Sequence, residues 1–268
     1  MVGATLQAAD WSTYQPAHTR ADIRKLKAAG IELIIPGAWH GGSANPHCRG
    51  DLKRARAEGL YTGTYAIVTT NGRFSIDKAR RVCGPEWEHL SFCAVDMELD
   101  GGSVPQVQAA IDRIVELGQR PIIYTAHWFW HGRFGNPKNF KHIPLWNAYY
   151  DQAPDIDFAS QPYGGWKLAD VVGEQYIGTH TFQGLEMDRN TFLREFVEQQ
   201  EDDMTFIGVG ANKATLGTDN FESFRLYVTA TGLVREKIPN AGEREALAIA
   251  GYPLLQLTSA QLNKYEER

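Results

Sequence analysis

The stretch from Ser91 to Thr125 reads SFCAVDMELDGGSVPQVQAAIDRIVELGQRPIIYT and decides the fold class. It predicts a strand over Ser91–Met97, a helix capped by Ser103, and a second strand over Arg120–Thr125. The helix ends before Gly118 and carries its apolar residues on one face, namely Val107, Ile111, Ile114 and Val115. Two strands joined by one amphipathic helix predict a parallel βαβ unit.

The same alternation of strand and helix occupies the chain before this unit. Strands are expected over Leu6–Ala9, Ile31–Pro36 and Thr62–Val68, and helices over Thr19–Ala29, over Asp51–Glu58, and from Ser75 as cap to Cys83. Five such units in a row favour either a closed barrel or a doubly wound sheet.

After Thr125 the pattern changes, because strand-like segments follow one another without an amphipathic helix. They cover Leu145–Tyr150, Gly165–Val172, Glu174–Ile177 and Thr181–Met187. A helix is expected to resume at Asn190, with Phe192, Leu193, Phe196 and Val197 as its apolar stripe. An open sheet needs helices on both faces, so we predict an α/β fold, an irregular TIM-like (β/α)5β3 barrel whose last strands have lost their helices.

Composition divides the chain near residue 203. Residues 204–268 hold seven Lys and Arg and seven Asp and Glu, so the net charge of −5 lies entirely in residues 1–203, as do all seven Trp. The last 65 or so residues predict a small α+β module. Its expected elements are a hairpin of Phe224–Thr229 and Leu233–Ile238, turning at Ala230-Thr231-Gly232, and helices over Ala241–Ala250 and Thr258–Tyr265. A module this small is expected to pack on the barrel or on a second copy, which would make a homo-oligomer.

The overall composition excludes several classes of protein. With 43% hydrophobic and 22% charged residues the chain is globular, and its net charge of −5 argues against nucleic-acid binding. No apolar run is long enough for membrane insertion, and no signal peptide is visible at the N-terminus. The three Cys are expected to be free thiols, and the eight His lack ligand spacing, so neither a metal nor a cofactor is predicted.

The pattern with the clearest chemistry is Asp96-Met97-Glu98 at the end of a predicted strand. Side chains alternate along a strand, so Asp96 and Glu98 share a face, with Cα atoms about 6.6 Å apart. Like charges at that distance raise one pKa, which leaves one carboxyl protonated and one ionised near neutrality. The pair alone is equally compatible with two solvated carboxylates.

Further polar and aromatic residues follow other predicted strands. Asp10 follows the first strand and Asp188 the last, and these two strands are neighbours in a closed barrel, so four carboxylates could line one cleft. The alternative for each acid is a turn or a helix cap. Aromatic rings that can stack on sugar faces occur at the same strand ends, although at least half are expected in the core: Tyr65, Tyr124, Trp128, Trp130, Trp146 and Tyr149.

The chain resembles the family 25 glycoside hydrolases, lysozymes that cut the bond between N-acetylmuramic acid and N-acetylglucosamine in peptidoglycan. The matching stretches appear in family order across about 190 residues: Ala9 to Gln15, Gly63-Thr64-Tyr65, Val95 to Glu98, Ile123-Tyr124-Thr125, Leu145 to Tyr149, Gln175-Tyr176 and Gly184 to Phe192. The resemblance implies Glu98 as general acid, Asp96 as its partner, and Asp10 and Asp188 as further acids of the cleft. It implies that Tyr65 and Trp146 are aromatic positions near the cleaved bond. Tyr124, Tyr149, Tyr176 and Trp11 are further candidates for substrate binding.

Carboxylates this close favour retention over inversion, which needs space for a water molecule, and Asp96 would act either as nucleophile or as the group that orients the substrate's N-acetyl group. The stretch Ile35 to His40 departs from the family, which usually has a Lys- or Thr-bearing end there, and the loop Ala126 to His142 is long and aromatic. These departures put substrate detail in doubt. Two alternatives stay open: a hydrolase of another acetamido-sugar polymer, and a non-catalytic glycan-binding or virion protein.

The C-terminal part more faintly resembles small modules of bacteriophage wall-lytic enzymes, through Tyr227-Val228-Thr229, Val234 to Ile238 and Gly251-Tyr252-Pro253. A wall-binding, self-associating or stabilising role is expected. The chain is therefore expected to be an endolysin, made in the host cytoplasm without a signal peptide and acting on the cell wall.

Overall fold

The computed structural model describes residues 3–158, 162–198, 205–211, 221–229, 232–238, 254–257 and 266–267. The chain divides into two compact units, Met1–Glu198 and Gln199–Arg268. The sequence placed the boundary at residue 203, five residues further on. Within the described part of the chain, none of the helices has the length and apolar character needed to cross a lipid bilayer.

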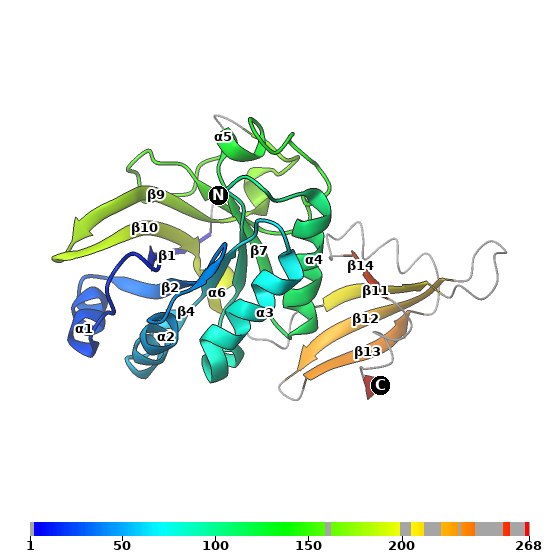
Figure 1. The fold of residues 1–268 in the computed structure, drawn as a ribbon, viewed down its shortest axis with the longest axis horizontal. Coiled ribbons are helices and arrows are strands. Elements are labelled where there is room, and N and C mark those ends of the chain that lie inside the picture. The colour runs from blue at the N-terminus through cyan, green and yellow to red at the C-terminus, as the bar shows by residue number, and fades with distance from the viewer. Residues whose placement is uncertain are drawn as a thin grey trace. The chain divides into compact units, whose positions relative to one another are not determined.

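The first unit is a closed ring of eight strands (Figure 1). The first strand closes the ring, because it pairs in parallel with the second and antiparallel with the last. The pairs between the last three strands are parallel for β8 with β9 and antiparallel for β9 with β10. The strands are β1 (Thr5–Trp11), β2 (Ile31–His40), β5 (Thr64–Ile67), β6 (Cys93–Asp96), β7 (Pro121–Thr125), β8 (Leu145–Ala148), β9 (Val171–Phe182) and β10 (Leu185–Leu193).

Helices follow each of the first five barrel strands and are sparse afterwards. Two further short strands, β3 (Ser43–Ala44) and β4 (Tyr61–Thr62), flank β2. The helices are α1 (Arg20–Ala28), α2 (Cys48–Ala57), α3 (Gly72–Cys83), α4 (Val104–Glu116), α5 (His127–Trp130) and α6 (Arg194–Glu198), with 3₁₀ turns η1 (Gly84–His89) and η2 (Leu168–Asp170). This arrangement agrees with the predicted barrel at the level of a closed α/β ring.

Alternation along β6 separates two apolar layers. Phe92 and Ala94 belong to the cluster inside the ring, whereas Cys93 and Val95 pack outward with residues of the helices. Phe92 stacks on Phe192 inside the ring, with ring centroids 5.3 Å apart. These rings fill the interior, so the barrel is a packed core with its cavity confined to the carboxyl ends of the strands.

Two predicted boundaries are wrong for identifiable reasons, and a third, the start of α4 after Ser103, is confirmed. The helix expected from Asn190 starts only at Arg194, because Asn190 lies in β10 and its side chain hydrogen-bonds inside the barrel. Helix α3 is capped by Asn71, whose side chain accepts from the Phe74 amide, and Ser75 lies within the helix. The expected cap Ser103 precedes α4 but makes no side-chain capping bond.

Of the three strands expected between residues 165 and 187, the part from Val171 onward forms one hairpin, and residues 165–170 are not in a strand. Strand β9 is continuous from Val171 to Phe182, and the turn falls on Gln183 and Gly184, which both have positive φ (55° and 76°). Two consecutive residues with positive φ match a type I′ turn. The sequence hides this turn because Gln takes the position where Asn or Asp is usual.

The second unit contains one five-stranded sheet in the order β14-β11-β12-β13-β15. The predicted hairpin is confirmed, because β12 and β13 pair antiparallel with Thr229 opposite Gly232. The helices predicted over 241–250 and 258–265 lie outside the described residues. The strands are β11 (Thr205–Ala211), β12 (Phe221–Thr229), β13 (Gly232–Ile238), β14 (Leu254–Leu257) and β15 (Glu266–Glu267).

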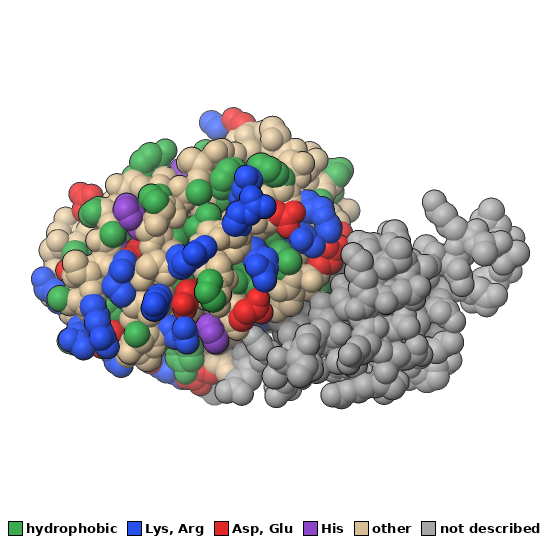
Figure 2. Space-filling view, turned by 60° about the horizontal axis from the view of Figure 1, so that its bottom comes forward, with side chains coloured by type: hydrophobic (Ala, Val, Ile, Leu, Met, Phe, Trp, Pro, Cys, Tyr) green, Lys and Arg blue, Asp and Glu red, His purple; other side chains and the backbone are tan. Residues whose placement is uncertain are grey.

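The surface of the first unit mixes both signs of charge, and Figure 2 shows Lys and Arg interspersed with Asp and Glu on the face it presents. Several Arg side chains pair with acids across helices. Arg20 and Arg24 both contact Glu58, and Arg56 contacts Glu86 at 2.8 Å. The three Cys are buried free thiols, as expected.

Candidate active site

A cavity of about 170 Å³ opens at the carboxyl ends of the barrel strands. This is the end of a barrel at which active sites lie. Its volume is below the roughly 300 to 1,000 Å³ of a pocket that encloses a whole ligand, so it fits one part of a longer molecule. The lining residues are Asp10, Ser12, His40, Tyr65, Asp96, Glu98, Tyr124, Trp146, Tyr150, Gln175 and Asp188.

Strand register brings the four predicted acids to this cavity. Asp96 ends β6, and Glu98 follows two residues later. Asp10, near the end of β1, lies directly opposite Asp188 of β10 in the antiparallel pair. All four line the cavity, so the structure brings together the carboxyl groups that the sequence singled out.

The four carboxyl groups differ in their surroundings. Asp96 and Asp10 are only 2% and 4% exposed, whereas Glu98 and Asp188 are half-buried. Burial, and then the charges of Glu98 and Asp10, raise the pKa of Asp96 well above its ordinary value. Among the described residues, Oδ1 of Asp96 is buried and has no hydrogen-bond partner.

Asp10 is held by two side-chain amides. Asn190 Nδ2 donates to Asp10 Oδ2 at 2.7 Å, and Gln175 Nε2 donates to the same oxygen at 3.1 Å. Gln175 Nε2 also lies 3.0 Å from Asp188 Oδ2. Burial and the charge of Asp188 nevertheless raise the pKa of Asp10 well above its usual range, although both amides lower it.

Glu98, two residues beyond the end of β6, is more accessible to solvent than Asp96. Burial first, and then the charge of Asp188, raise the pKa of Glu98. A carboxyl group with a raised pKa stays protonated at higher pH, which is the condition for a general acid. Glu98 therefore combines access to a ligand with a tendency to hold its proton.

The aromatic rings at the cavity form a connected floor. Trp146 packs edge-on against Tyr124 and Tyr65, with centroids 4.6 and 6.4 Å away. The Trp146 indole N–H donates to Asn190 Oδ1 at 2.9 Å, and the Tyr124 hydroxyl donates to Gln175 Oε1 at 2.6 Å. The indole N–H of Trp146 and the hydroxyl of Tyr124 therefore both donate to protein groups. Through these bonds the two rings position the side-chain amides that hold Asp10.

Gly37 of β2 lies directly against the Tyr65 ring. A Cβ atom at Gly37 would lie 2.4 Å from Cζ of Tyr65 and 2.7 Å from its hydroxyl oxygen. Only glycine leaves room for the Tyr65 ring at this position. Three residues later, His40 lines the cavity, and burial lowers its pKa.

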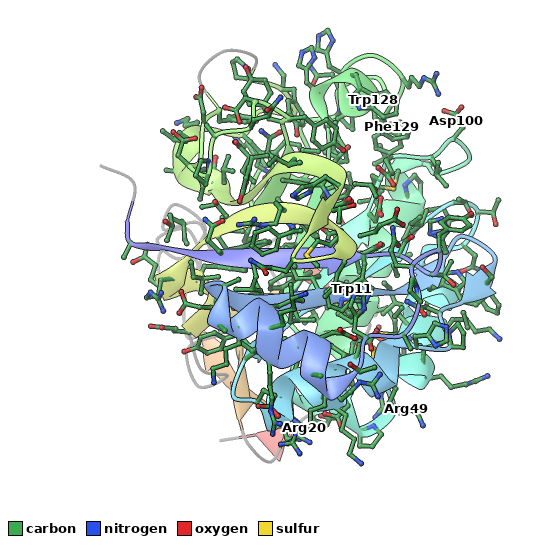
Figure 3. All side chains as sticks on the ribbon, turned by 90° about the vertical axis from the view of Figure 1, so that its left-hand side faces the viewer. Trp11, Arg20, Arg49, Asp100, Trp128 and Phe129 are labelled. Carbon is green, nitrogen blue, oxygen red and sulfur yellow. The ribbon has the colours of Figure 1, made fainter. Side chains whose placement is uncertain are left out.

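Three residues predicted to bind substrate do not line this cavity. Trp11 packs outward against Ile23 and Leu26 of α1, and its indole N–H donates to buried Asp51 at 3.1 Å (Figure 3). The Tyr176 hydroxyl donates to Oε1 of Gln7, a residue of β1. Tyr149 is replaced at the cavity by its neighbour Tyr150, which is 55% exposed.

Trp11 and Tyr176 point away because each follows a cavity residue on a strand. Asp10 and Gln175 face the cavity, so alternation turns the next residue to the other side. Tyr149 lies beyond the end of β8 at Ala148, where strict alternation no longer applies. The sequence predictions did not include His40, Tyr150, Gln175 or Ser12, and alternation along β1 from Asp10 carried enough information only for Ser12.

The predicted aromatic loop after β7 forms its own packed cluster. Trp130 packs against Phe134 and Trp166, with centroids 4.9 Å away in both cases. Trp128 is 50% exposed and lies beside Phe129 at the edge of the barrel, near Asp100 (Figure 3). Neither Trp128 nor Trp130 lines the cavity.

A closed α/β barrel with an acidic, aromatic cavity at the carboxyl ends of its strands has the architecture and groups of a glycoside hydrolase. Residues 9–177 match the model of glycosyl hydrolases family 25. This is more than half of the chain, and the chain belongs to that family and is a lysozyme-type glycoside hydrolase.

Solved structures share the fold at low sequence identity. The CTP1L endolysin is 16% identical with a TM-score of 0.57, over 94% of this chain and 81% of that chain. A family 25 glycosyl hydrolase from Bacillus anthracis is 14% identical with a TM-score of 0.56, over 70% and 88%. The modular autolysin LytC from Streptococcus pneumoniae, solved with a synthetic peptidoglycan ligand, is 13% identical with a TM-score of 0.53, over 71% and 48%. A comparison with curated protein sequences gives no match.

Proposed function

We propose that this chain is a peptidoglycan hydrolase that cleaves the β-1,4 bond between N-acetylmuramic acid and N-acetylglucosamine. Membership of the family supports this, as do the solved relatives that are described as an endolysin and an autolysin. The observation that carries the proposal is the pairing of half-buried Glu98, whose pKa is raised, with buried Asp96 in one cavity.

In the proposed mechanism Glu98 is the general acid. Its proton passes to the glycosidic oxygen while the bond between that oxygen and the anomeric carbon breaks, and the bonding electrons stay on the oxygen. The sugar on the other side acquires positive charge at its anomeric carbon. Asp188 assists because its negative charge keeps Glu98 protonated.

Asp96 is proposed to stabilise the positive charge. This role requires the ionised form of Asp96, whereas burial favours its protonated form. Ionised Asp96 either attacks the anomeric carbon directly or orients the substrate's N-acetyl oxygen for that attack, and both routes retain the anomeric configuration. A water molecule, deprotonated by Glu98, then releases the product. The two routes differ with de-N-acetylated muramic acid as substrate, because only the direct nucleophile still works.

Asp10 and Asp188 are proposed to hold the reacting sugar from the β1–β10 side. The Asp10–Gln175–Asn190 hydrogen bonds fix one oxygen of Asp10 in place before substrate binds. Tyr65, Tyr124 and Trp146 form the apolar floor beneath the sugar ring. Exposed Tyr150 is the residue best placed for stacking on a sugar face, since most of its ring is free.

The (β/α)5β3 pattern and the domain roles are part of the proposal. Residues 1–203 are proposed as the catalytic barrel and residues 204–268 as an accessory module that binds the wall or self-associates. The enzyme is proposed to act at the bacterial cell wall. Light scattering of the full chain separates these roles, because self-association gives a dimer mass without any wall fragment present.

The central experiment compares wild type, Glu98→Gln and Glu88→Gln on purified peptidoglycan. Glu88 is a matched control, because it is an exposed acid whose only described ion pair is with Arg80 at the surface. Mass spectrometry of the products identifies the new reducing end. We expect a new muramic acid end with wild type and Glu88→Gln and a loss of at least about 100-fold with Glu98→Gln.

Other outcomes separate the alternatives. A new glucosamine end, or cleavage of chitin alone, assigns the site to another acetamido-sugar polymer. Binding of wall fragments without cleavage by wild type favours a glycan-binding protein. Wild-type turnover by Glu98→Gln would remove Glu98 from the role of general acid.

A further inference from the structure

A second acidic cluster lies outside the cavity, on the opposite side of β9. It consists of Asp151 and Asp155, on the segment after β8, and Glu174 of β9. One carboxylate oxygen from each residue lies within 4.8 Å of the other two. Asp151 and Asp155 are exposed, whereas Glu174 is 0% exposed.

Glu174 is independent support for a ligand at this cluster. Its Oε2 accepts a hydrogen bond from the Asp157 amide at 3.0 Å. Its Oε1 is buried and has no hydrogen-bond partner among the described residues. An unpartnered buried acceptor costs free energy, so native structures usually supply a donor, a water molecule or an ion.

No described Lys or Arg side chain forms an ion pair with these three acids. Burial, and then the charges of Asp151 and Asp155, raise the pKa of Glu174 to about 8, against the lowering effect of hydrogen bonds from the Asp157 amide and the Asn147 side chain. The same arrangement becomes favourable when a cation supplies the missing positive charge.

We propose that Asp151, Asp155 and Glu174 bind one divalent cation, of the oxygen-coordinated kind that Ca²⁺ represents. Ca²⁺ takes carboxylate and water oxygens at about 2.3 to 2.6 Å, so its ligands are at most about 4.6 to 5.2 Å apart. Oxygens within 4.8 Å of one another fit that span. Mg²⁺ requires ligands at about 2.0 to 2.1 Å and holds them closer together.

The position of the cluster gives the cation a structural role beside the cavity. Tyr150 precedes Asp151 and lines the cavity, and Gln175 follows Glu174 and bonds Asp10 there. A cation on the outer side of β9 would therefore fasten the Tyr150 segment to the strand that carries Gln175. The cation site itself does not depend on the proposed hydrolysis.

Calcium binding by the full chain is the direct test. The protein is treated with EDTA, freed of the chelator, and titrated with CaCl₂ by isothermal calorimetry, with thermal unfolding measured in parallel. We expect one ion per chain at this site. At a concentration 100 times the dissociation constant, we expect the unfolding midpoint of the first unit to rise by roughly 5 to 11 °C.

Three variants locate the ion. Asp151→Asn and Asp155→Asn change exposed side chains and are expected to fold, and each is expected to weaken Ca²⁺ binding at least about 10-fold. Glu98→Gln removes a charge from the cavity instead and is the matched control, which is expected to keep wild-type Ca²⁺ affinity. Glu174→Gln keeps the shape of the buried side chain and is expected to lose the calcium-dependent rise.

Specific results would overturn the proposal. They are the absence of heat and of any midpoint change with 10 mM CaCl₂ in wild type, and unchanged affinity in Asp155→Asn. Loss of binding in Glu98→Gln with retention in Asp155→Asn would place the ion in the cavity. Stabilisation by MgCl₂ but not CaCl₂ would contradict the assignment of the ion.

Discussion

Asp10 and Asp188 lie directly opposite one another across β1 and β10, and a single amide group, Nε2 of Gln175, donates to Oδ2 of both at 3.1 and 3.0 Å. Two carboxylates that close repel each other when both are ionised. The amide reduces this repulsion because it stabilises negative charge on either partner, and it lowers the pKa of both. Gln175 is in turn oriented by the Tyr124 hydroxyl at 2.6 Å.

Replacement of Gln175 by Leu is expected to lower kcat/KM about 10- to 100-fold, because it removes a donor to two carboxylates worth roughly 1.5 to 3 kcal/mol. Turnover of soluble peptidoglycan fragments measures the effect. Gln108→Leu is the matched control, since Gln108 donates to Asp112 within α4, far from the cavity. Equal losses in the two variants would show that the effect is not specific to the amide between the acids.

The charge on Asp188 is expected to set the alkaline limit of activity. Glu98 works as an acid only while protonated, so activity falls as pH rises through its pKa. Asp188 raises that pKa, and Asp188→Asn is therefore expected to move the alkaline limb of the kcat/KM profile to lower pH. Asp100→Asn serves as control because Asp100 is exposed and pairs with Arg133. A limb that stays in place, or moves to higher pH, contradicts this coupling.

Buried Asp96 is expected to reduce the stability of the fold. Its folded pKa is raised above the unfolded value, so the folded state holds the extra proton and unfolding free energy falls as pH rises between the two values. Asp96→Asn removes this titrating group and is expected to raise the free energy of unfolding more at pH 8 than at pH 4.

Urea unfolding of Asp96→Asn and wild type at both pH values checks that prediction, with turnover of peptidoglycan measured in parallel. The variant is expected to gain stability and lose activity together. A variant less stable than wild type at pH 8 would mean that ionised Asp96 is favourably solvated in the cavity.

Much of the barrel follows from the sequence because local patterns and tertiary pairing agree there. Helix α1 begins where Thr19 caps it and ends before Gly30, as the apolar spacing of Ile23 and Leu26 indicates. The pattern failed at Asn190, whose side chain bonds Asp10 180 residues away. Local sequence cannot show such a partner, and a residue typical of helix caps was instead a buried strand residue.

In the candidate site, too, some residues could be predicted from local sequence and others could not. Asp96 and Glu98 were predictable because both lie within one short segment, and alternation gives them a common face. Trp11 was predicted for the cavity although Asp10 already occupied that face, so the same rule applied to β1 excludes it. His40 and Tyr150 reach the cavity only through a bulge in β2 and a turn after β8, which the sequence does not mark.

Substitutions of Trp11 and Tyr150 are therefore expected to have opposite effects on stability and on KM. Trp11→Phe removes an indole donor from fully buried Asp51 and is expected to lower stability by about 1 to 3 kcal/mol with KM unchanged. Tyr150→Ala is expected to raise KM with the unfolding midpoint unchanged, because the ring is 55% exposed at the cavity. Unfolding curves and initial rates on both variants check this. A raised KM in Trp11→Phe would contradict this prediction and indicate that Trp11 contacts the substrate.

The contact between Gly37 and Tyr65 permits the sharpest test of the cavity floor. A methyl group at residue 37 overlaps the Tyr65 ring, which is 8% exposed and has little room to move. Gly37→Ala is expected to cost about 1 to 3 kcal/mol of stability and to lower kcat/KM at least about 10-fold. Gly42→Ala is the matched control, because nothing lies within 4 Å of a Cβ atom there.

The double variant Gly37→Ala, Tyr65→Leu distinguishes overlap with the ring from strain in the backbone. If the ring is the cause, the second substitution relieves part of the loss in stability, and the two changes are non-additive by at least about 0.5 kcal/mol. Activity is not expected to return, because the double variant lacks the tyrosine ring between Gly37 and Trp146. Additive losses would instead assign the effect to the conformation of β2 at its bulge between Gly37 and Trp39.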